Sequence, residues 1–261
     1  MFPLRDHNPS NCTPYVVYVL IAANVLAYLL YSGLSTNPQA LMQFYQAYAI
    51  IPAQIVGGEN SSTLLTSVFI HGGLMHLGGN MLFLWIFGDN LEDEMGHLPF
   101  LAFYLACGVG AGLIHVLAAP TSQVPTIGAS GAIAGVMGGY LLLFPKARVD
   151  ILLILIIFFR VITVPAALML GLWLALQIFG GFGSDPNEGG VAYWAHAGGF
   201  AVGLVLALPL WLRRGGPRFW QQTAGTPPNP KTEYTYSVTR VPHLPRKKKN
   251  PGRTKPGPWG K

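Results

Sequence analysis

Long apolar runs alternate with short polar stretches over most of the chain. A helix that crosses the hydrocarbon core of a bilayer needs about 20 mainly apolar residues. Runs near that length occupy residues 15–32, 68–87, 98–119, 127–144, 165–182 and 191–212. Helices satisfy their own backbone hydrogen bonds, so such runs adopt them in lipid. The pattern predicts an all-α, polytopic membrane protein built on a bundle of six transmembrane helices.

Two of the apolar runs allow another interpretation. Residues 151–163 resemble a seventh span, but this run is short, contains Arg160 and is followed by Pro165. Runs of that length are more often interfacial or re-entrant, so we expect it in the loop between the fourth and fifth spans. The first run resembles a secretory signal, but it is longer than the usual apolar core and no cleavage site follows closely. We therefore expect it to be a span.

Composition agrees with a membrane protein. The chain is 51% hydrophobic and 10% charged, whereas a soluble domain carries about 25% charged residues. Its 32 glycines fit close helix packing in lipid. Cys12 lies before the first run and Cys107 inside the third, so neither a disulfide nor a metal-ligand spacing is expected.

The basic residues define an orientation. With six spans, one side holds Arg5, the loop with Lys146, Arg148 and Arg160, and the chain after the last span, which together contain all 16 Lys and Arg. The positive-inside rule makes that side, and both termini, cytoplasmic. The net charge of +6 therefore indicates topology and not nucleic-acid binding. We expect the plasma (inner) membrane of a prokaryote.

The segments outside the spans divide the chain further. Residues 1–14 are expected to form a cytoplasmic N-terminal segment, and residues 15–212 the six-span core. Residues 213–261 are basic and rich in proline, which predicts an unfolded, solvated cytoplasmic tail. Contact of this tail with anionic lipid headgroups is the alternative. The stretch 41–58 is amphipathic and poor in charge, so this first loop is expected to lie in the membrane interface. A packed extracellular cap is the alternative.

Polar side chains inside the spans are costly in lipid and are functional candidates for that reason. They are His71, His76 and Asn80 in or near the second span, His115 in the third, Ser130 in the fourth and His196 in the sixth. The second, fourth and sixth spans all enter from the outside, which brings His76, Asn80, Ser130 and His196 to a similar depth in the outer half. His76 and Asn80 are four residues apart and share a face, whereas His71 is expected higher, near the mouth.

Glycine stripes provide a way for two of these helices to meet. Gly131, Gly135 and Gly139 recur every four residues on the fourth span, as do Gly199 and Gly203 on the sixth. Such stripes allow close backbone approach, so Ser130 and His196 are expected to meet above the contact. A serine needs an adjacent base, which histidine supplies near neutral pH. Because the outer halves contain no Asp or Glu, the sequence predicts a Ser–His dyad. His76, the Asn80 amide and the Ser130 backbone N–H are available to stabilise an oxyanion.

Four segments carry a family resemblance. "HGGLMHLGGN", "FGDNLEDEMGH", "GASGAIAGVMGG" and "AHAGGFAVG", in this order, resemble signature segments of the rhomboid family of intramembrane serine proteases. The resemblance implies that Ser130 is the nucleophile, His196 the general base, and His76, Asn80 and the Ser130 backbone the oxyanion donors.

The same resemblance gives supporting roles to other residues. Gly128 belongs to the turn before Ser130, His71 matches a histidine at the cavity mouth, and Glu92 matches a structural acidic residue at the cytoplasmic end of the second span. It implies transmembrane substrates cut near small residues, in segments that unwind easily, with no cofactor and no metal. One position departs from some members, which have an aromatic residue bracing the histidine where this chain has Ala134.

Two other functions fit parts of the pattern. A metal-binding or transport protein would use His71, His76, His115 and His196, since histidine-only sites occur, but it leaves Ser130 and Asn80 without a role. An inactive family member would bind membrane segments without cutting them, and the presence of both Ser130 and His196 argues against it.

Overall fold

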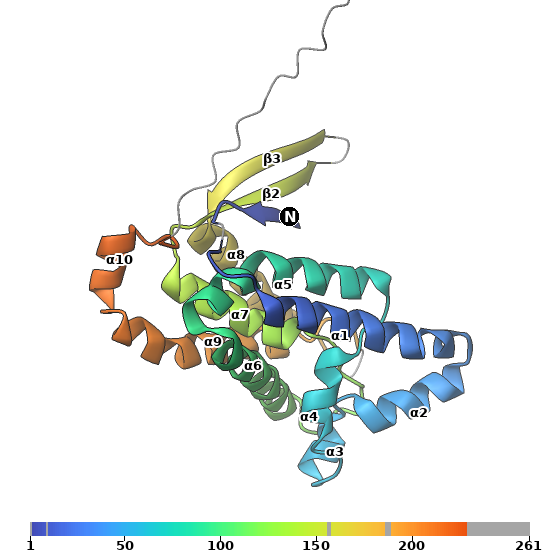
Figure 1. Ribbon diagram of the computed structural model, residues 1–261. Helices are drawn as coiled ribbons and strands as arrows, with labels where there is room; N and C mark the ends of the chain where they lie inside the picture. The colour runs from blue at the N-terminus through green and yellow to red at the C-terminus, as the bar shows by residue number, and fades with distance from the viewer. Residues whose placement is uncertain (1, 9, 156–157, 186–188, 229–261) are drawn as a thin grey trace, which may run out of the picture.

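The computed structural model describes residues 2–8, 10–155, 158–185 and 189–228. Its long helices follow the six apolar runs (Figure 1). They are α1 (Tyr15–Tyr31), α5 (Leu74–Met95), α6 (His97–Ala118), α7 (Ser130–Leu143), α8 (Ala166–Gly183) and α9 (Tyr193–Arg213). The mostly helical membrane fold is therefore confirmed.

Four of these helices are long and apolar enough to cross a membrane: α1, α6, α8 and α9. Helix α7 has only 14 residues, and the last two turns of α5 contain Asp89, Glu92, Asp93 and Glu94. The count of six transmembrane crossings stays a prediction.

Helix α5 differs most from the predicted run 68–87. It begins six residues later, at Leu74, because Ser67–Phe69 forms the 3₁₀ turn η2 and Gly72 and Gly73 precede the helix. Glycine is a poor helix former, so the pair separates the turn from α5. The helix then continues to Met95 and ends at Gly96, whose φ of +81° is a conformation that glycine adopts readily.

Short helices connect α1 to α5 at the end of the bundle opposite the β-sheet (Figure 1). They are η1 (Ser32–Thr36), α2 (Pro38–Tyr48), α3 (Pro52–Val56) and α4 (Thr63–Thr66). Proline near the first helical position starts α2 and α3, and the Asn37 side chain accepts a hydrogen bond from Ala40 N at 3.1 Å to cap α2. The interfacial position of this region stays a prediction.

A three-stranded antiparallel sheet, which the sequence pattern did not reveal, covers the other end. Strands β1 (Phe2–Asp6), β2 (Arg148–Leu155) and β3 (Phe158–Pro165) lie in that order, with Phe2 opposite Leu152 and Arg148 opposite Pro165. The run 151–163 thus belongs to two paired strands and not to a seventh helix. Pairing of β1 with β2 also holds the N-terminal segment beside the α7–α8 loop.

The chain after α9 is folded where an unfolded tail was expected. Pro217–Thr223 forms α10, and its Phe219 side chain is buried. The Trp220 indole donates a hydrogen bond to the carbonyl oxygen of Leu142 at 2.9 Å, and Lys146 N donates to the carbonyl oxygen of Gly225 at 2.8 Å. The predicted tail 213–261 is therefore wrong for residues 213–228, because aromatic side chains bury against the core. Residues 229–261 lie outside the described part of the chain.

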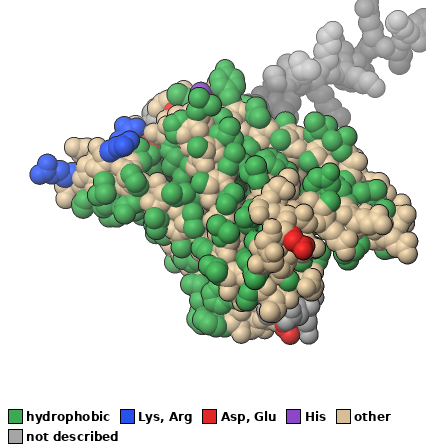
Figure 2. All heavy atoms as spheres, turned by 90° about the horizontal axis from the view of Figure 1, so that it is seen from below, with side chains coloured by type: hydrophobic (Ala, Val, Ile, Leu, Met, Phe, Trp, Pro, Cys, Tyr) green, Lys and Arg blue, Asp and Glu red, His purple; other side chains and the backbone are tan. Residues whose placement is uncertain are grey.

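The core centres on α7, in which every residue from Gly131 to Tyr140 is buried. Large hydrophobic side chains such as Leu117 and Phe182 are instead exposed on the outer helix surfaces. Hydrophobic side chains cover most of the face in Figure 2, with few charges among them. That distribution is expected of a bundle whose outer surface faces lipid.

Candidate active site

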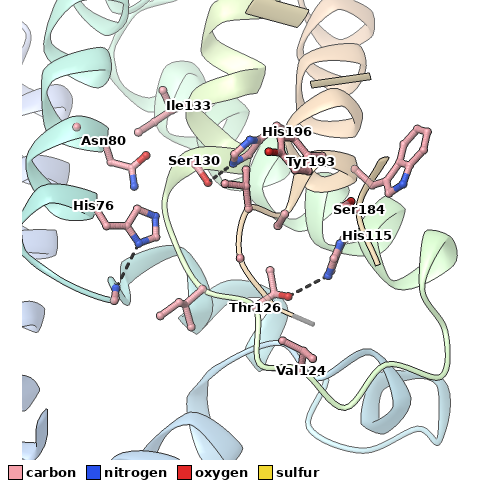
Figure 3. Close-up of a pocket in the computed structure, with 18 of the residues that line it drawn as sticks. His76, Asn80, His115, Val124, Thr126, Ser130, Ile133, Ser184, Tyr193 and His196 are labelled. Carbon is pink, nitrogen blue, oxygen red and sulfur yellow. Dashed lines mark hydrogen bonds between the residues drawn. The ribbon is translucent and has the colours of Figure 1, made fainter. Parts of the chain in front are cut away.

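Ser130 and His196 meet at the start of two neighbouring helices. Ser130 is the first residue of α7, and His196 lies in the first turn of α9. Ser130 Oγ lies 2.8 Å from His196 Nε2 (Figure 3). This is hydrogen-bond distance for a hydroxyl and an imidazole nitrogen.

The glycines of α9 set the separation between the two helices. A methyl group at Gly199 would collide with the carbonyl oxygen of Gly131, and one at Gly203 with the carbonyl oxygen of Gly135. Only glycine allows the backbones to come this close. Two glycines of α7 face a third helix, because a methyl group at Gly131 would lie 2.6 Å from the Ala111 side chain of α6 and one at Gly135 would collide with that of Cys107. Helix α7, which carries Ser130, is therefore packed closely against α9, which carries His196, and against α6.

Helix α8 holds the far side of the His196 ring. The side-chain oxygen of Gln177 lies 2.8 Å from His196 Nδ1. The Trp173 ring, one turn earlier, lies tilted beside the imidazole with 5.8 Å between ring centroids. Ala134 is buried and has no ring that could pack against His196. In this chain Gln177 and Trp173 contact the His196 ring instead.

Helix α5 presents His76 and Asn80 on the side of Ser130 away from His196 (Figure 3). His76 Nδ1 accepts a hydrogen bond from Gly72 N at 3.3 Å, so the ring proton belongs on Nε2. Asn80 Nδ2 is buried and has no hydrogen-bond partner within the described residues. Both side chains thus hold a donor available to the cavity.

The turn before Ser130 depends on Gly128. Its φ is +128°, and a Cβ there would lie 2.8 Å from His76 Nε2. A side chain at this position would be strained and would displace the His76 ring. Gly128 therefore allows the turn, Ser130 and His76 to lie together.

His71 is not at the cavity mouth, contrary to the expectation from sequence. Its side chain is buried, and its Nε2 accepts a long hydrogen bond from Ala129 N at 3.4 Å. Its backbone N–H and carbonyl both bond to the Tyr31 hydroxyl of α1. Because α5 begins only at Leu74, after Gly72 and Gly73, His71 lies in the loop before that helix and its side chain turns inward. The residue supports the turn before Ser130 from behind.

A cavity of about 800 Å³ opens in front of these residues. It is lined by α5, α7, α8 and α9 and by the loops that precede α7 and α9, at the end opposite the sheet. Its polar side chains include those of His76, Asn80, His115, Thr126, Ser130 and His196. The volume is in the range of ligand-binding sites.

The histidines near the cavity have different hydrogen-bond partners. His115 Nε2 lies 2.9 Å from Thr126 Oγ1, while His71 faces Ala129 N and His196 faces Ser130 and Gln177. No group of three His, Cys, Asp or Glu side chains arranged to hold a metal occurs in the ranges that the structure describes.

Glu92 lies far from the cavity, at the sheet end of α5. Its carboxylate oxygens accept hydrogen bonds from Val16 N and Val17 N, each at 2.9 Å, and one oxygen lies 2.5 Å from His97 Nδ1. A carboxylate at the first N–H groups of α1 stabilises that helix start. The contacts are those of a structural residue.

Gln177 and Trp173 are the site residues that sequence reasoning missed. Gln177 is the only residue of α8 with a side-chain amide, hydroxyl or charge. A polar group in an apolar span was the signal that selected His76 and Ser130, and it applied equally to Gln177. Trp173 gave no comparable signal, because an aromatic residue in a span is ordinary.

Known proteins share this chain's sequence pattern. A family model described as the Rhomboid domain matches residues 59–213. The mitochondrial Rhomboid protein 1 of Saccharomyces cerevisiae is 31% identical over 205 residues, which cover 76% of this chain and 53% of that protein. Rhomboid protease GluP of Bacillus subtilis is 36% identical over 134 residues, 51% of this chain and 25% of that protein.

A plant relative, the chloroplastic Rhomboid-like protein 11 of Arabidopsis thaliana, is 36% identical over 152 residues, 57% of this chain and 51% of that protein. The chain thus spans about half, or less, of the length of these relatives. The family model covers more than half of the chain, including α5 to α9 and the residues that line the cavity. This integral membrane protein belongs to the rhomboid family.

Proposed function

We propose that the chain is an intramembrane serine endopeptidase in which Ser130 is the nucleophile and His196 the general base. The observation that carries the proposal is the 2.8 Å contact between Ser130 Oγ and His196 Nε2 beside a cavity of about 800 Å³. A relative named as a protease, GluP of Bacillus subtilis, supports the same reaction class.

The reaction follows from these two side chains. Ser130 Oγ forms a bond to the scissile carbonyl carbon as its proton moves to His196 Nε2. His196 then gives the proton to the amide nitrogen, the C–N bond breaks and an acyl-enzyme remains. Water attacks the ester carbon, loses its proton to His196, and Ser130 regains a proton as the second product leaves.

Three donors are proposed to stabilise the oxyanion: Asn80 Nδ2, His76 Nε2 and the Ser130 backbone N–H. The first has no other partner in the described residues, and the His76 proton is directed to Nε2 by the Gly72 contact. Ser130 begins α7, and N–H groups of a first helical turn have no partner within the helix. Donors that are already in position stabilise developing charge without reorganisation.

The proposed substrate is a transmembrane segment of another protein, because the cavity lies among helices with lipid-facing outer surfaces. A carbonyl inside an intact helix is already hydrogen-bonded to the following turn. The segment must therefore unwind locally before Ser130 reaches it, which favours sequences with small or helix-breaking residues. The metal-binding and inactive-binder alternatives have no specific observation in their favour.

We also propose that the sheet end is cytoplasmic and the cavity end faces outward, in the plasma membrane of a prokaryote. Arg5, Lys146 and Arg148 all belong to the sheet end, which is the side that the positive-inside rule makes cytoplasmic. Contact of the basic tail with anionic lipid is a proposal from sequence alone, since residues 229–261 lie outside the described part.

Covalent trapping tests the chemistry most directly. A fluorophosphonate reacts with an activated serine, so it is expected to modify Ser130 in the purified full chain, as located by mass spectrometry. Ser130→Ala and His196→Ala must both abolish the modification. Labelling that persists in the His196→Ala protein would remove His196 as the base.

Orientation is tested by thiol labelling in intact cells. In a Cys12→Ser background, Glu59→Cys and Lys146→Cys place exposed thiols at opposite ends of the bundle. An impermeant maleimide added outside is expected to label the first and not the second. Labelling of both from the same side would contradict the proposed topology.

A further inference from the structure

Helix α8 buries one polar side chain against the dyad. Gln177 is 9% exposed in a helix whose other side chains are apolar or aromatic. A buried amide costs free energy unless its donors and acceptor are bonded. Its hydrogen bonds therefore indicate what it does.

The two ends of the amide have different partners. Gln177 Nε2 lies 3.4 Å from the carbonyl oxygen of Trp173, one turn back on α8. A carbonyl oxygen only accepts hydrogen bonds, so the NH₂ end of the amide must face it. This leaves the amide oxygen, which only accepts, directed at His196 Nδ1 at 2.8 Å.

That orientation determines the tautomer of His196. An acceptor at 2.8 Å requires the proton on Nδ1. In a neutral imidazole, Nε2 then carries the free lone pair, and it faces Ser130 Oγ at 2.8 Å. The opposite amide orientation would place the proton on Nε2, where it could not accept the serine proton.

We propose that Gln177 is a positioning residue that holds His196 in the base-competent tautomer; this rests on the proposed protease function. The amide oxygen bonds to Nδ1–H in the neutral ring and bonds more strongly when the ring becomes positively charged after accepting the Ser130 proton. A carboxylate in the same place would stabilise the charged ring further, but its own charge would have to be buried. The Trp173 ring beside His196 limits rotation of the imidazole.

Three side chains at position 177 separate positioning from packing. Gln177→Met keeps the length and removes the acceptor, while Gln177→Glu keeps the acceptor and adds charge. The measurement is the rate of Ser130 modification by a fluorophosphonate across pH, in the full chain in detergent. It needs no identified substrate, and its acidic limb reports protonation of the base.

Positioning predicts an ordered series. Gln177→Met is expected to react about ten times more slowly, as for one lost hydrogen bond, with its acidic limb moved to lower pH. Gln177→Glu is expected to recover much of the rate, with the limb moved about one to three units to higher pH. The midpoint should therefore rise in the order Met, Gln, Glu.

Asn24→Leu is the matched control. Asn24 is a buried amide of α1 that also donates to the carbonyl one turn back, Leu20 O at 2.7 Å, far from the dyad. This variant is expected to change thermal stability and leave the midpoint unmoved.

Several outcomes would overturn the inference. They are a Gln177→Met protein with the wild-type rate and midpoint, a slower protein with an unmoved midpoint, or an unmoved midpoint in Gln177→Glu. If Gln177→Met does not fold, Gln177→Glu alone decides. Failure of the wild-type protein to react at Ser130 would instead refute the protease function, a result distinct from any of these.

Discussion

The two ends of the bundle use buried polar groups in opposite ways. At the sheet end, Asp150 accepts hydrogen bonds from Arg5 at 2.9 Å and from Thr163 at 2.5 Å and lies 2.7 Å from His7. Glu92 is bonded to the start of α1, and Glu94 pairs with Arg214 at 2.7 Å. These carboxylates join segments that are distant in sequence.

At the cavity end, two buried polar atoms of cavity-lining residues have no hydrogen-bond partner among the described residues. They are Asn80 Nδ2 and His115 Nδ1. Leaving a buried polar atom unpaired costs roughly 1–3 kcal/mol, and proteins accept this cost at functional sites. The difference teaches that polar groups at the sheet end hold the fold together, whereas those at the cavity end are available for chemistry.

The largest expected effect is loss of the dyad. Ser130→Ala and His196→Ala should each lower cleavage of a transmembrane reporter in proteoliposomes by on the order of 10⁶, with little change in thermal stability. Because the two residues act as one unit, the double variant should be scarcely worse than either single one. A Ser130→Ala protein that still cleaves would end the protease proposal.

Two asparagines on α5 sharpen the comparison. Asn80→Ala removes a proposed oxyanion donor and should lower the rate by about 10²–10³, leaving measurable activity from the remaining donors. Asn90→Ala is the matched change at the sheet end, where Asn90 Nδ2 donates to the carbonyl oxygen of Asn8 at 2.9 Å. It should cost roughly 1–3 kcal/mol of stability with little change in kcat/KM. Equal kinetic effects of the two variants would contradict the division of roles.

Glycine substitutions test the packing that connects the ends. A methyl group at Gly203 would meet the backbone of Gly135, which cannot move aside, so Gly203→Ala should destabilise by about 1–3 kcal/mol. Gly171→Ala meets nothing within 4 Å on α8 and should be neutral or stabilising, by up to about 1 kcal/mol. Denaturant titration in detergent measures both, and a neutral Gly203→Ala would refute the close α7–α9 contact.

The apolar runs in the sequence predicted the long helices well, because each helix forms within a single run. The predicted 98–119 and the observed His97–Ala118 differ by one residue at each end. The sheet was missed because the run 151–163 contains no Gly, Pro, Asn or Asp to indicate a turn between β2 and β3. The third strand, residues 2–6, is distant in sequence and leaves no trace in that run. For the same reason motif spacing could name Ser130 and His196, but it could not show that Gln177 reaches across from α8.

The last expected effect concerns pH and is confined to the sheet end, where two aspartates should respond in opposite directions. Burial and the nearby charge of Asp89, only partly offset by hydrogen bonds from Asn8 and Tyr140, raise the pKa of Asp6 from 3.8 to about 7. The folded state therefore binds this proton more readily, so the stability from Asp6 is complete below pH 3.8 and is lost as pH rises to about 7. Asp6→Asn should reduce that slope and raise the thermal midpoint more at pH 8 than at pH 4.

Asp150 is the matched control of opposite sign. Burial alone would raise its pKa, but hydrogen bonds from Thr163, His7 and Arg5 outweigh it and lower the pKa to about 2. Its stabilisation is present above pH 3.8 and is lost only as pH falls toward 2. Asp150→Asn should therefore lower the thermal midpoint at both pH 5 and pH 8. If stability still depends on pH to the same extent between pH 4 and 7 in the Asp6→Asn protein, another group is responsible for that dependence. Both variants should leave fluorophosphonate labelling of Ser130 in the folded protein unchanged, because neither side chain belongs to the cavity end.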